Sequence, residues 1–203
     1  KYTNIRKLSD NRFLNLFHLD ALTDSGRPFD YYFVSRRKAD QIKLLTKDSA
    51  AEGVVIFPVW REDPEKIVLL RQYRYPLDDV LYELPAGLID AGETPECAAI
   101  REMKEETGLS FEVYTGGDAA YRRPFFMGAG FTDESCNAIF GYASGAISRR
   151  EQEDTESIQV LVAGKDEVRR ILREEKVSIR AAYLLMSFLN ASEEAPFGFL
   201  DSF

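Results

Sequence analysis

Cysteine and histidine are scarce in this chain of 203 residues, which contains two cysteines and one histidine. Cys97 and Cys136 form no Cys-x-x-Cys pair, and two widely separated cysteines exclude the disulfide framework of a small secreted scaffold. A lone histidine in a strand-like run, here His18, is more often a packed or edge residue than a ligand or catalytic group. The low cysteine content favours a reducing compartment, and we expect a cytoplasmic protein.

Long hydrophobic runs and an excess of positive charge are also missing. The longest apolar run, Val54 to Trp60, is far shorter than the roughly 18 residues of a membrane helix. No secretory hydrophobic segment follows Lys1. The net charge of −8 argues against nucleic acid or an anionic membrane as a partner. An acidic protein that acts on an anionic substrate would need local positive charge from metals and a few arginines.

An acidic segment with capping signals for the start and the end of a helix lies at residues 83 to 109. Thr94 is a favourable N-cap, Pro95 suits the first helical position, and Gly108 suits a left-handed C-terminal stop. At 3.6 residues per turn, three glutamates share an arc of about 100°, while the neighbouring arc holds Ala99, Ile100 and Met103. The pattern predicts a helix with one packing face beside a face formed by Glu102, Glu105 and Glu106.

Three carboxylates so close together would raise one another's pKa and oppose folding unless positive charge lies between them. A hard divalent cation such as Mg²⁺ is the natural candidate, because it prefers oxygen ligands. Arg101 lies one turn before Glu105 and could orient it, and Glu93 could in turn hold Arg101. The alternative is a solvated amphipathic helix without a metal.

The spacing of these residues resembles the signature of the Nudix hydrolases. Five residues separate Gly87 from Glu93, and seven more precede the segment Arg101-Glu102-Met103-Lys104-Glu105-Glu106-Thr107-Gly108-Leu109. The resemblance implies that Glu102 and Glu106 are the main metal ligands and that Glu105 is a further ligand or holds metal-bound water. It also implies a backbone ligand at the Ala86 carbonyl, a structural ion pair between Glu93 and Arg101, and Mg²⁺ as cofactor, with Mn²⁺ as the alternative.

The aromatic runs at residues 12–20 and 28–36 flank Thr-Asp-Ser-Gly, which is a β-hairpin signal. A two-stranded ribbon cannot bury so many aromatic side chains alone. In the ADP-ribose pyrophosphatase branch of the Nudix hydrolases, a similar N-terminal sheet completes a dimer and lends residues to the neighbouring active site. The resemblance therefore implies a homodimer.

The remaining pattern predicts an α/β fold, which the resemblance specifies as a Nudix-type α/β/α sandwich with a mixed central sheet plus an N-terminal β-hairpin or small sheet. Strands are expected at 53–60, 66–72, 111–114, 137–143 and 157–163, and helices at 165–176 and 179–189. The continuous apolar runs predict a sheet buried on both faces, with an edge or a bulge at Pro58. We expect a dimerisation segment at 1–48, a Nudix domain at 49–190 and a tail at 191–203 that the pattern does not assign.

Substrate-binding residues are expected mainly before the acidic segment. The stretch from Arg71 to Gly87 resembles the lead-in of ADP-ribose and nucleotide-sugar pyrophosphatases, where an arginine contacts phosphate. Arg74 is the first candidate and Arg71 the second, with surface ion pairs as the alternative. Further candidates are Glu83 and Leu88, together with Glu134, which a structural cap would also explain. The loop before Glu134 usually carries a proline where this chain has Ala129.

A mixed charge run at residues 149–156 precedes a predicted strand. Such a run is usually a solvated loop. In ADP-ribose pyrophosphatases the corresponding loop carries acids that bind a further metal and activate the attacking water. The resemblance places these acids at Asp154 and Glu156, with Glu153 as a rival general base.

The predicted reaction is Mg²⁺-dependent hydrolysis of a nucleoside diphosphate derivative, with ADP-ribose giving AMP and ribose 5-phosphate. The metal and arginines would neutralise the crowded charge of the diphosphate. One alternative substrate class is GDP-mannose or another nucleotide sugar, because the metal motif is shared. Another alternative is a non-catalytic nucleotide sensor, although the chain has no room for a winged helix.

Overall fold

The computed structural model describes residues 1–152 and 157–201. The chain forms two compact units: unit 1 comprises Lys1–Glu52 and Pro124–Cys136, and unit 2 comprises Gly53–Arg123 and Asn137–Phe203. Residues 124–136 thus belong with the N-terminal segment although they are distant from it in sequence. Within the described ranges, no helix is both long enough and apolar enough to cross a bilayer.

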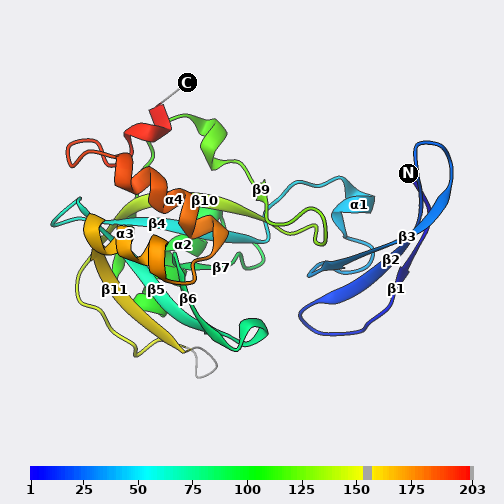
Figure 1. Ribbon diagram of the computed structural model, residues 1–203, viewed down its shortest axis with the longest axis horizontal. Coiled ribbons are helices and arrows are strands. Elements are labelled where there is room, and N and C mark those ends of the chain that lie inside the picture. The colour runs from blue at the N-terminus through cyan, green and yellow to red at the C-terminus, as the bar shows by residue number, and fades with distance from the viewer. Residues whose placement is uncertain (153–156, 202–203) are drawn as a thin grey trace. The chain divides into compact units, whose positions relative to one another are not determined.

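Unit 1 is built on an antiparallel sheet in which β2 (Asn15–Leu22) lies between β1 (Tyr2–Lys7) and β3 (Pro28–Ser35) (Figure 1). Strand alternation directs Phe17 and Leu19 of β2 and Phe33 of β3 into a small core with Ile42, which precedes α1 (Lys43–Thr46). β9 (Phe125–Phe126) pairs with Ser135 and Cys136 at the start of β10 (Ser135–Ser144). The predicted hairpin is therefore present, and β1 is an additional strand.

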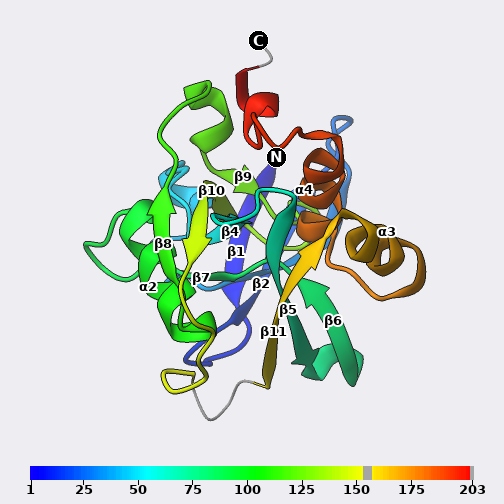
Figure 2. The ribbon, with the colours of Figure 1, turned by 90° about the vertical axis from the view of Figure 1, so that its left-hand side faces the viewer.

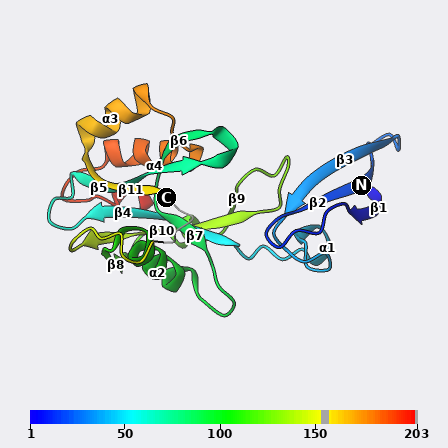
Figure 3. The same cartoon turned by 90° about the horizontal axis from the view of Figure 1, so that it is seen from below.

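Unit 2 contains a twisted sheet in the order β11, β5, β4, β10, β8, with β6 beside β5 and β7 beside β4 (Figure 2). The strands are β4 (Gly53–Trp60), β5 (Lys66–Arg74), β6 (Asp79–Glu83), β7 (Ala86–Leu88), β8 (Ser110–Val113), β10 (Ser135–Ser144) and β11 (Ile158–Gly164). The helices are α2 (Pro95–Thr107), α3 (Lys165–Glu174) and α4 (Ile179–Asn190), with short 3₁₀ turns at Tyr75–Leu77, Ala119–Arg122 and Gly198–Asp201. In Figure 3, β4, β5 and β11 lie between α2 on one side and α3 with α4 on the other.

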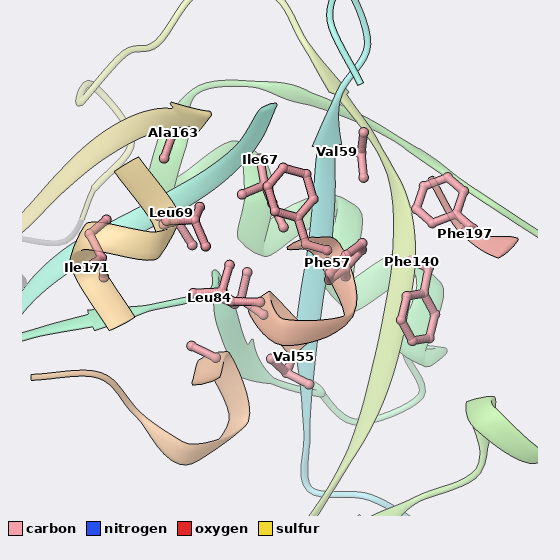
Figure 4. Close-up of a cluster of buried hydrophobic side chains, with 14 of the residues drawn as sticks. Val55, Phe57, Val59, Ile67, Leu69, Leu84, Phe140, Ala163, Ile171 and Phe197 are labelled. Atoms are coloured by element: carbon pink, nitrogen blue, oxygen red, sulfur yellow. The ribbon is translucent and has the colours of Figure 1, made fainter. Parts of the chain in front are cut away.

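Both faces of this sheet are buried, as the continuous apolar runs predicted. Alternate residues of β4 point to opposite sides, so Val55, Phe57 and Val59 meet α3 and α4, and this cluster is drawn in Figure 4. Val54 and Ile56 instead pack with residues of α2. Burial of a side chain such as Phe57 contributes ~1.5–3 kcal/mol. The mixed α/β sandwich predicted from the sequence is therefore the observed fold.

From the sequence, Pro58 is expected at an edge or a bulge. It is not on an edge strand, because β4 lies between β5 and β10. The pairing of β4 with β5 is confined to Val59 opposite Ile67, so the ladder is irregular at this proline, as the second alternative expects. Ile100 is 45% exposed rather than packed, because the buried face of α2 is centred on Ala99 and Met103. The tail, which the sequence pattern does not assign, places buried Phe197 edge-on against the Phe57 ring at a centroid distance of 6.2 Å.

Candidate active site

Helix α2 begins and ends where its sequence predicts. The Thr94 hydroxyl oxygen accepts a hydrogen bond from the Cys97 N–H at 3.2 Å, and Pro95 occupies the first helical position. Gly108 adopts a left-handed φ of 76°, and its N–H donates to the Lys104 carbonyl. Because both ends are fixed, the register of the helix and hence the direction of its glutamates are fixed too.

The bend at Ala86 and Gly87 in β7 faces two of these glutamates. The Ile56 N–H donates to the Pro85 carbonyl at 2.8 Å, so this pair is a hydrogen-bonded pair of the antiparallel ladder. Hydrogen-bonded and non-hydrogen-bonded pairs alternate, so the next pair leaves the N–H and carbonyl of Ala86 directed away from β4. That N–H donates to Glu106 Oε2 at 3.1 Å. The Ala86 carbonyl is therefore also not used by the β4–β7 ladder.

Glycine at position 87 makes room for the Glu102 carboxylate. A Cβ atom at Gly87 would lie 1.8 Å from Glu102 Cδ and 2.0 and 2.3 Å from its two carboxylate oxygens. Such separations are far inside van der Waals contact, so a larger residue would displace the carboxylate. Glu102 and Glu106, one helical turn apart, are thus both placed against the Ala86–Gly87 bend.

Arg101 links the helix to the preceding loop. Its Nε and Nη2 atoms donate to the two carboxylate oxygens of Glu93 at 3.1 and 2.9 Å, and Nη2 also donates to the Leu88 carbonyl at 2.8 Å. The hydrogen bonds that Arg101 and the Asp90 N–H donate to the Glu93 carboxylate lower the pKa of Glu93. The Nη1 atom of Arg101 donates to Glu102 Oε1 at 2.9 Å and to Glu105 Oε2 at 3.0 Å.

The α2 donor set fits a hard divalent cation in chemistry, since carboxylate and carbonyl oxygens are the ligands that Mg²⁺ prefers. Gly87 leaves space for the Glu102 carboxylate, and the Ala86 carbonyl is directed away from β4. Glu102, Glu106 and a backbone oxygen are therefore brought to one place. Arg101 Nη1 contacts both Glu102 and Glu105, but the Glu105 side chain is 43% exposed, whereas that of Glu102 is 15% exposed. The three glutamates therefore do not converge as one tight group, and Glu102 with Glu106 form the better pair.

A different group in unit 1 has tighter donor spacing. Among the described residues, His18, Asp20 and Asp30 have ligand atoms within 4.8 Å of one another. Arg6 Nη2 already lies 2.5 Å from His18 Nδ1 and 2.7 Å from Asp20 Oδ1, while His18 Nε2 lies 2.6 Å from Asp30 Oδ1. Buried His18 also stacks on Tyr32. In this structure the Arg6 guanidinium supplies the positive charge beside these donors, and no backbone carbonyl of the described residues is shown among them.

The two candidate phosphate-binding arginines lie on opposite faces of β5. Val68 packs on the α2 side and Leu69 on the α3–α4 side, so strand alternation places Arg74 on the α2 side and Arg71 on the other. Arg74 Nε donates to Glu83 Oε2 at 2.5 Å, and Glu83 is buried. The structure therefore brings Arg74 and Glu83, but not Arg71, to the face that carries the α2 glutamates.

The remaining predicted residues have varied positions. Leu88 is 46% exposed next to the bend, and its carbonyl accepts from Arg101. Glu134 lies in unit 1, where Arg36 Nε donates to Glu134 Oε2 at 3.3 Å. Glu153, Asp154 and Glu156 lie outside the described residues.

One contact of α2 was not predicted: Gln152 Nε2 donates to the Glu106 carbonyl at 2.6 Å. No sequence pattern signals a bond between residues so far apart.

Comparisons with known proteins agree with this fold and motif. A profile of the NUDIX domain matches residues 50–181. An ADP-ribose pyrophosphatase from Bacillus subtilis is 31% identical over 167 residues, covering 79% of this chain and 85% of that protein. An ADP-ribose pyrophosphatase from Saccharomyces cerevisiae is 46% identical over 127 residues, covering 61% of this chain and 52% of the yeast protein.

The chain spans about half the length of that yeast relative and of a similar protein from Caenorhabditis elegans, 52% in each case. A crystal structure of an ADP compounds hydrolase matches with a TM-score of 0.68 over 94% of both chains. At 18% sequence identity, this match establishes likeness of fold.

Proposed function

The chain belongs to the NUDIX domain family, and from this premise we propose that it hydrolyses the pyrophosphate bond of ADP-ribose to AMP and ribose 5-phosphate. The observation that carries the proposal is the placement of the Glu102 and Glu106 carboxylates against the Ala86–Gly87 bend. The ADP-ribose pyrophosphatases of Bacillus subtilis and yeast support the choice of substrate.

The proposed cofactor is Mg²⁺, with Mn²⁺ as a substitute. Glu102, Glu106 and the Ala86 carbonyl would hold it, and the ion would supply charge neutralisation on the diphosphate. Arg101 keeps Glu105 beside this pair, where it is the proposed further ligand or water-holding group. The proposed general base is one of Glu153, Asp154 and Glu156.

Arg74 is the proposed phosphate contact. Its Nε is engaged by Glu83, which fixes the guanidinium plane, and the side chain is 40% exposed, so its remaining N–H groups can reach a ligand. A guanidinium donates two parallel hydrogen bonds to phosphate oxygens, which orients the substrate as well as neutralising it. Leu88 and Glu134 are further proposed substrate contacts. Arg71 is a weaker candidate, because it lies on the face of β5 opposite to Arg74 and α2.

A homodimer in the cytoplasm is part of the same proposal. Unit 1 exposes several large apolar side chains, including Phe13 at 64%, Phe131 at 63% and Phe126 at 59%. Such exposure favours an interface, because isolated sheets of this size leave apolar surface in water. Light scattering after gel filtration should give twice the chain mass of 23.1 kDa. A monomer at all concentrations would contradict this part. Both cysteines are free, as a reducing compartment would allow.

The substrate assignment is tested by product analysis with Mg²⁺ in ¹⁸O water. ADP-ribose, GDP-mannose, UDP-glucose, NADH and diadenosine polyphosphates are compared at equal concentration. The proposal expects the highest kcat/KM with ADP-ribose, and label in one of the two phosphate products identifies the phosphorus attacked. A preference for GDP-mannose would transfer the assignment to nucleotide sugars. Binding without turnover of any of them would indicate a non-catalytic sensor.

A further inference from the structure

The C-terminal turn of α2 is capped by a segment from the loop between β10 and β11. The last carbonyls of a helix have no partner within the helix. Here the Ser148 N–H donates to the Thr107 carbonyl at 2.9 Å, and Gln152 Nε2 donates to the Glu106 carbonyl at 2.6 Å. These two hydrogen bonds, which we call the α2 anchor, join residues that are 41 and 46 positions apart in sequence.

The anchor is closely fitted rather than incidental. A Cβ atom at Gly108 would lie 2.6 Å from both the nitrogen and the Cβ of Ser148, so only glycine lets the end of α2 and the loop segment at Ser148 approach this closely. The Gln152 N–H donates to the Arg149 carbonyl at 3.4 Å, which closes a turn and directs the side chain toward the helix. Loop and helix are therefore matched at this point by backbone shape as well as by the glutamine amide.

Glu106 is consequently held at two points. Its carboxylate accepts from the Ala86 N–H at 3.1 Å, and its own carbonyl accepts from Gln152. The residue is buried, so loss of the Gln152 amide would remove a hydrogen bond to the Glu106 carbonyl from a residue with little access to water. The helix end would then fray, and Glu106 lies in the last turn.

We propose that Gln152 is a positioning residue for divalent-metal binding, which acts by fixing the backbone of Glu106 through the α2 anchor. This inference rests on the proposed function, because it takes Glu106 as a metal ligand. Metal–oxygen distances tolerate deviations of only about 0.2 Å, so a small movement of the last turn weakens the site without unfolding the domain.

The test compares Gln152→Met, which keeps the side-chain length but lacks the N–H donor, with Glu151→Gln as a matched neighbour. The Glu151 side chain is about half exposed, and its Oε1 atom lies 3.9 Å from Lys104 Nζ. Gln152→Ala provides the same comparison if the methionine variant does not fold. The readouts are the Mg²⁺ concentration for half-maximal activity, KM for ADP-ribose, and the Mg²⁺-induced shift in Tm without substrate.

We expect Gln152→Met to raise the half-maximal Mg²⁺ concentration by about tenfold, equal to ~1.4 kcal/mol of binding. It should also reduce the Mg²⁺-induced Tm shift and leave KM at saturating Mg²⁺ within about twofold. Glu151→Gln should match the wild type. A Gln152→Met protein with wild-type Mg²⁺ dependence would overturn the inference, even if its metal-free Tm fell, since that pattern is the signature of a purely structural cap.

Glu106→Gln separates the two levels of the proposal. If Glu106→Gln no longer responds to Mg²⁺ in activity or in Tm, while Gln152→Met responds like the wild type, the positioning role is wrong and the proposed metal site stands. If Glu106→Gln itself keeps wild-type activity and Mg²⁺ dependence, the proposed function is wrong, and the inference about Gln152 is overturned with it.

Discussion

Substitution of Gly87 by alanine tests the metal site separately from the stability of the fold. The new methyl group would lie 1.8 Å from Glu102 Cδ, where carbon–carbon contacts normally measure about 3.5–4 Å. Gly87 has no positive φ, so alanine is compatible with its backbone. The atoms that collide belong to the end of a flexible side chain, which can rotate away. The strain is therefore relieved by moving the Glu102 carboxylate and not by unfolding β7.

The size of the expected effect follows from that movement. The carboxylate must retreat by about 1.7–2.2 Å to restore normal contact, whereas a metal ligand tolerates about 0.2 Å. A displacement of about 1 Å in a catalytic arrangement can cost about 100-fold in rate. We therefore expect Gly87→Ala to lower kcat/KM for ADP-ribose by about 100-fold and to abolish most of the Mg²⁺-induced Tm shift.

The assay measures kcat/KM and the Tm of the metal-free protein in parallel. Gly198→Ala is the matched control, because its added Cβ would meet only Ala195 Cβ at an ordinary 3.4 Å. We expect the metal-free Tm of Gly87→Ala to stay within a few degrees of the wild type. Activity of Gly87→Ala within threefold of the wild type would refute the argument that Glu102 must rest against this glycine to function.

Three further predictions follow. Millimolar Mg²⁺ should raise the Tm, because the ion binds the folded carboxylates and not the unfolded chain; an unchanged Tm would contradict a preformed site. Arg74→Ala should lower kcat/KM about tenfold more than Arg71→Ala in steady-state assays; equal losses would remove the distinction between the faces of β5. Hydrogen bonds from Lys43, the Ser135 N–H and Arg37 lower the pKa of Glu52 below its ordinary 4.5 despite the opposing effect of burial. The stability lost in Glu52→Gln should therefore be largest above pH 4.5 and vanish as the pH falls through the folded pKa, as urea unfolding at pH 7 and pH 3 can test.

The features predicted correctly from the sequence are those that depend on neighbouring residues. Thr94, Pro95 and Gly108 punctuate α2 because capping is a local hydrogen-bonding problem that involves only the residues of one turn. The runs in β4 and β5 identify a sheet covered on both faces because side-chain alternation is local as well.

The features that were missed depend on contacts between distant segments. Ile100 was assigned to the packing face because the helix period does not fix where that face is centred. The pairing of Arg6 with His18 requires β1, whose polar sequence carries no strand signal. The same limit applies to Gln152, because a glutamine within a charge run has no local pattern that indicates a partner in α2.

The placement of Arg74 shows what the structure adds to a list of candidates. Arg74 is the first candidate from the sequence and Arg71 the second, but both arginines of β5 carry the same charge and lie three residues apart, so composition alone does not separate them. Strand alternation then assigns them to different faces, and only the face with Val68 and α2 also carries Glu83. The choice between two chemically identical groups is therefore a consequence of strand register.

A crystal of the protein soaked in Mn²⁺, with the ion located by anomalous scattering, tests most directly whether Glu102 and Glu106 form a metal site with the Ala86 carbonyl. We predict an anomalous peak about 2.0–2.3 Å from an oxygen of each of these three residues. A peak at His18, Asp20 and Asp30 with none beside Gly87, or no peak at saturating Mn²⁺, would contradict the account.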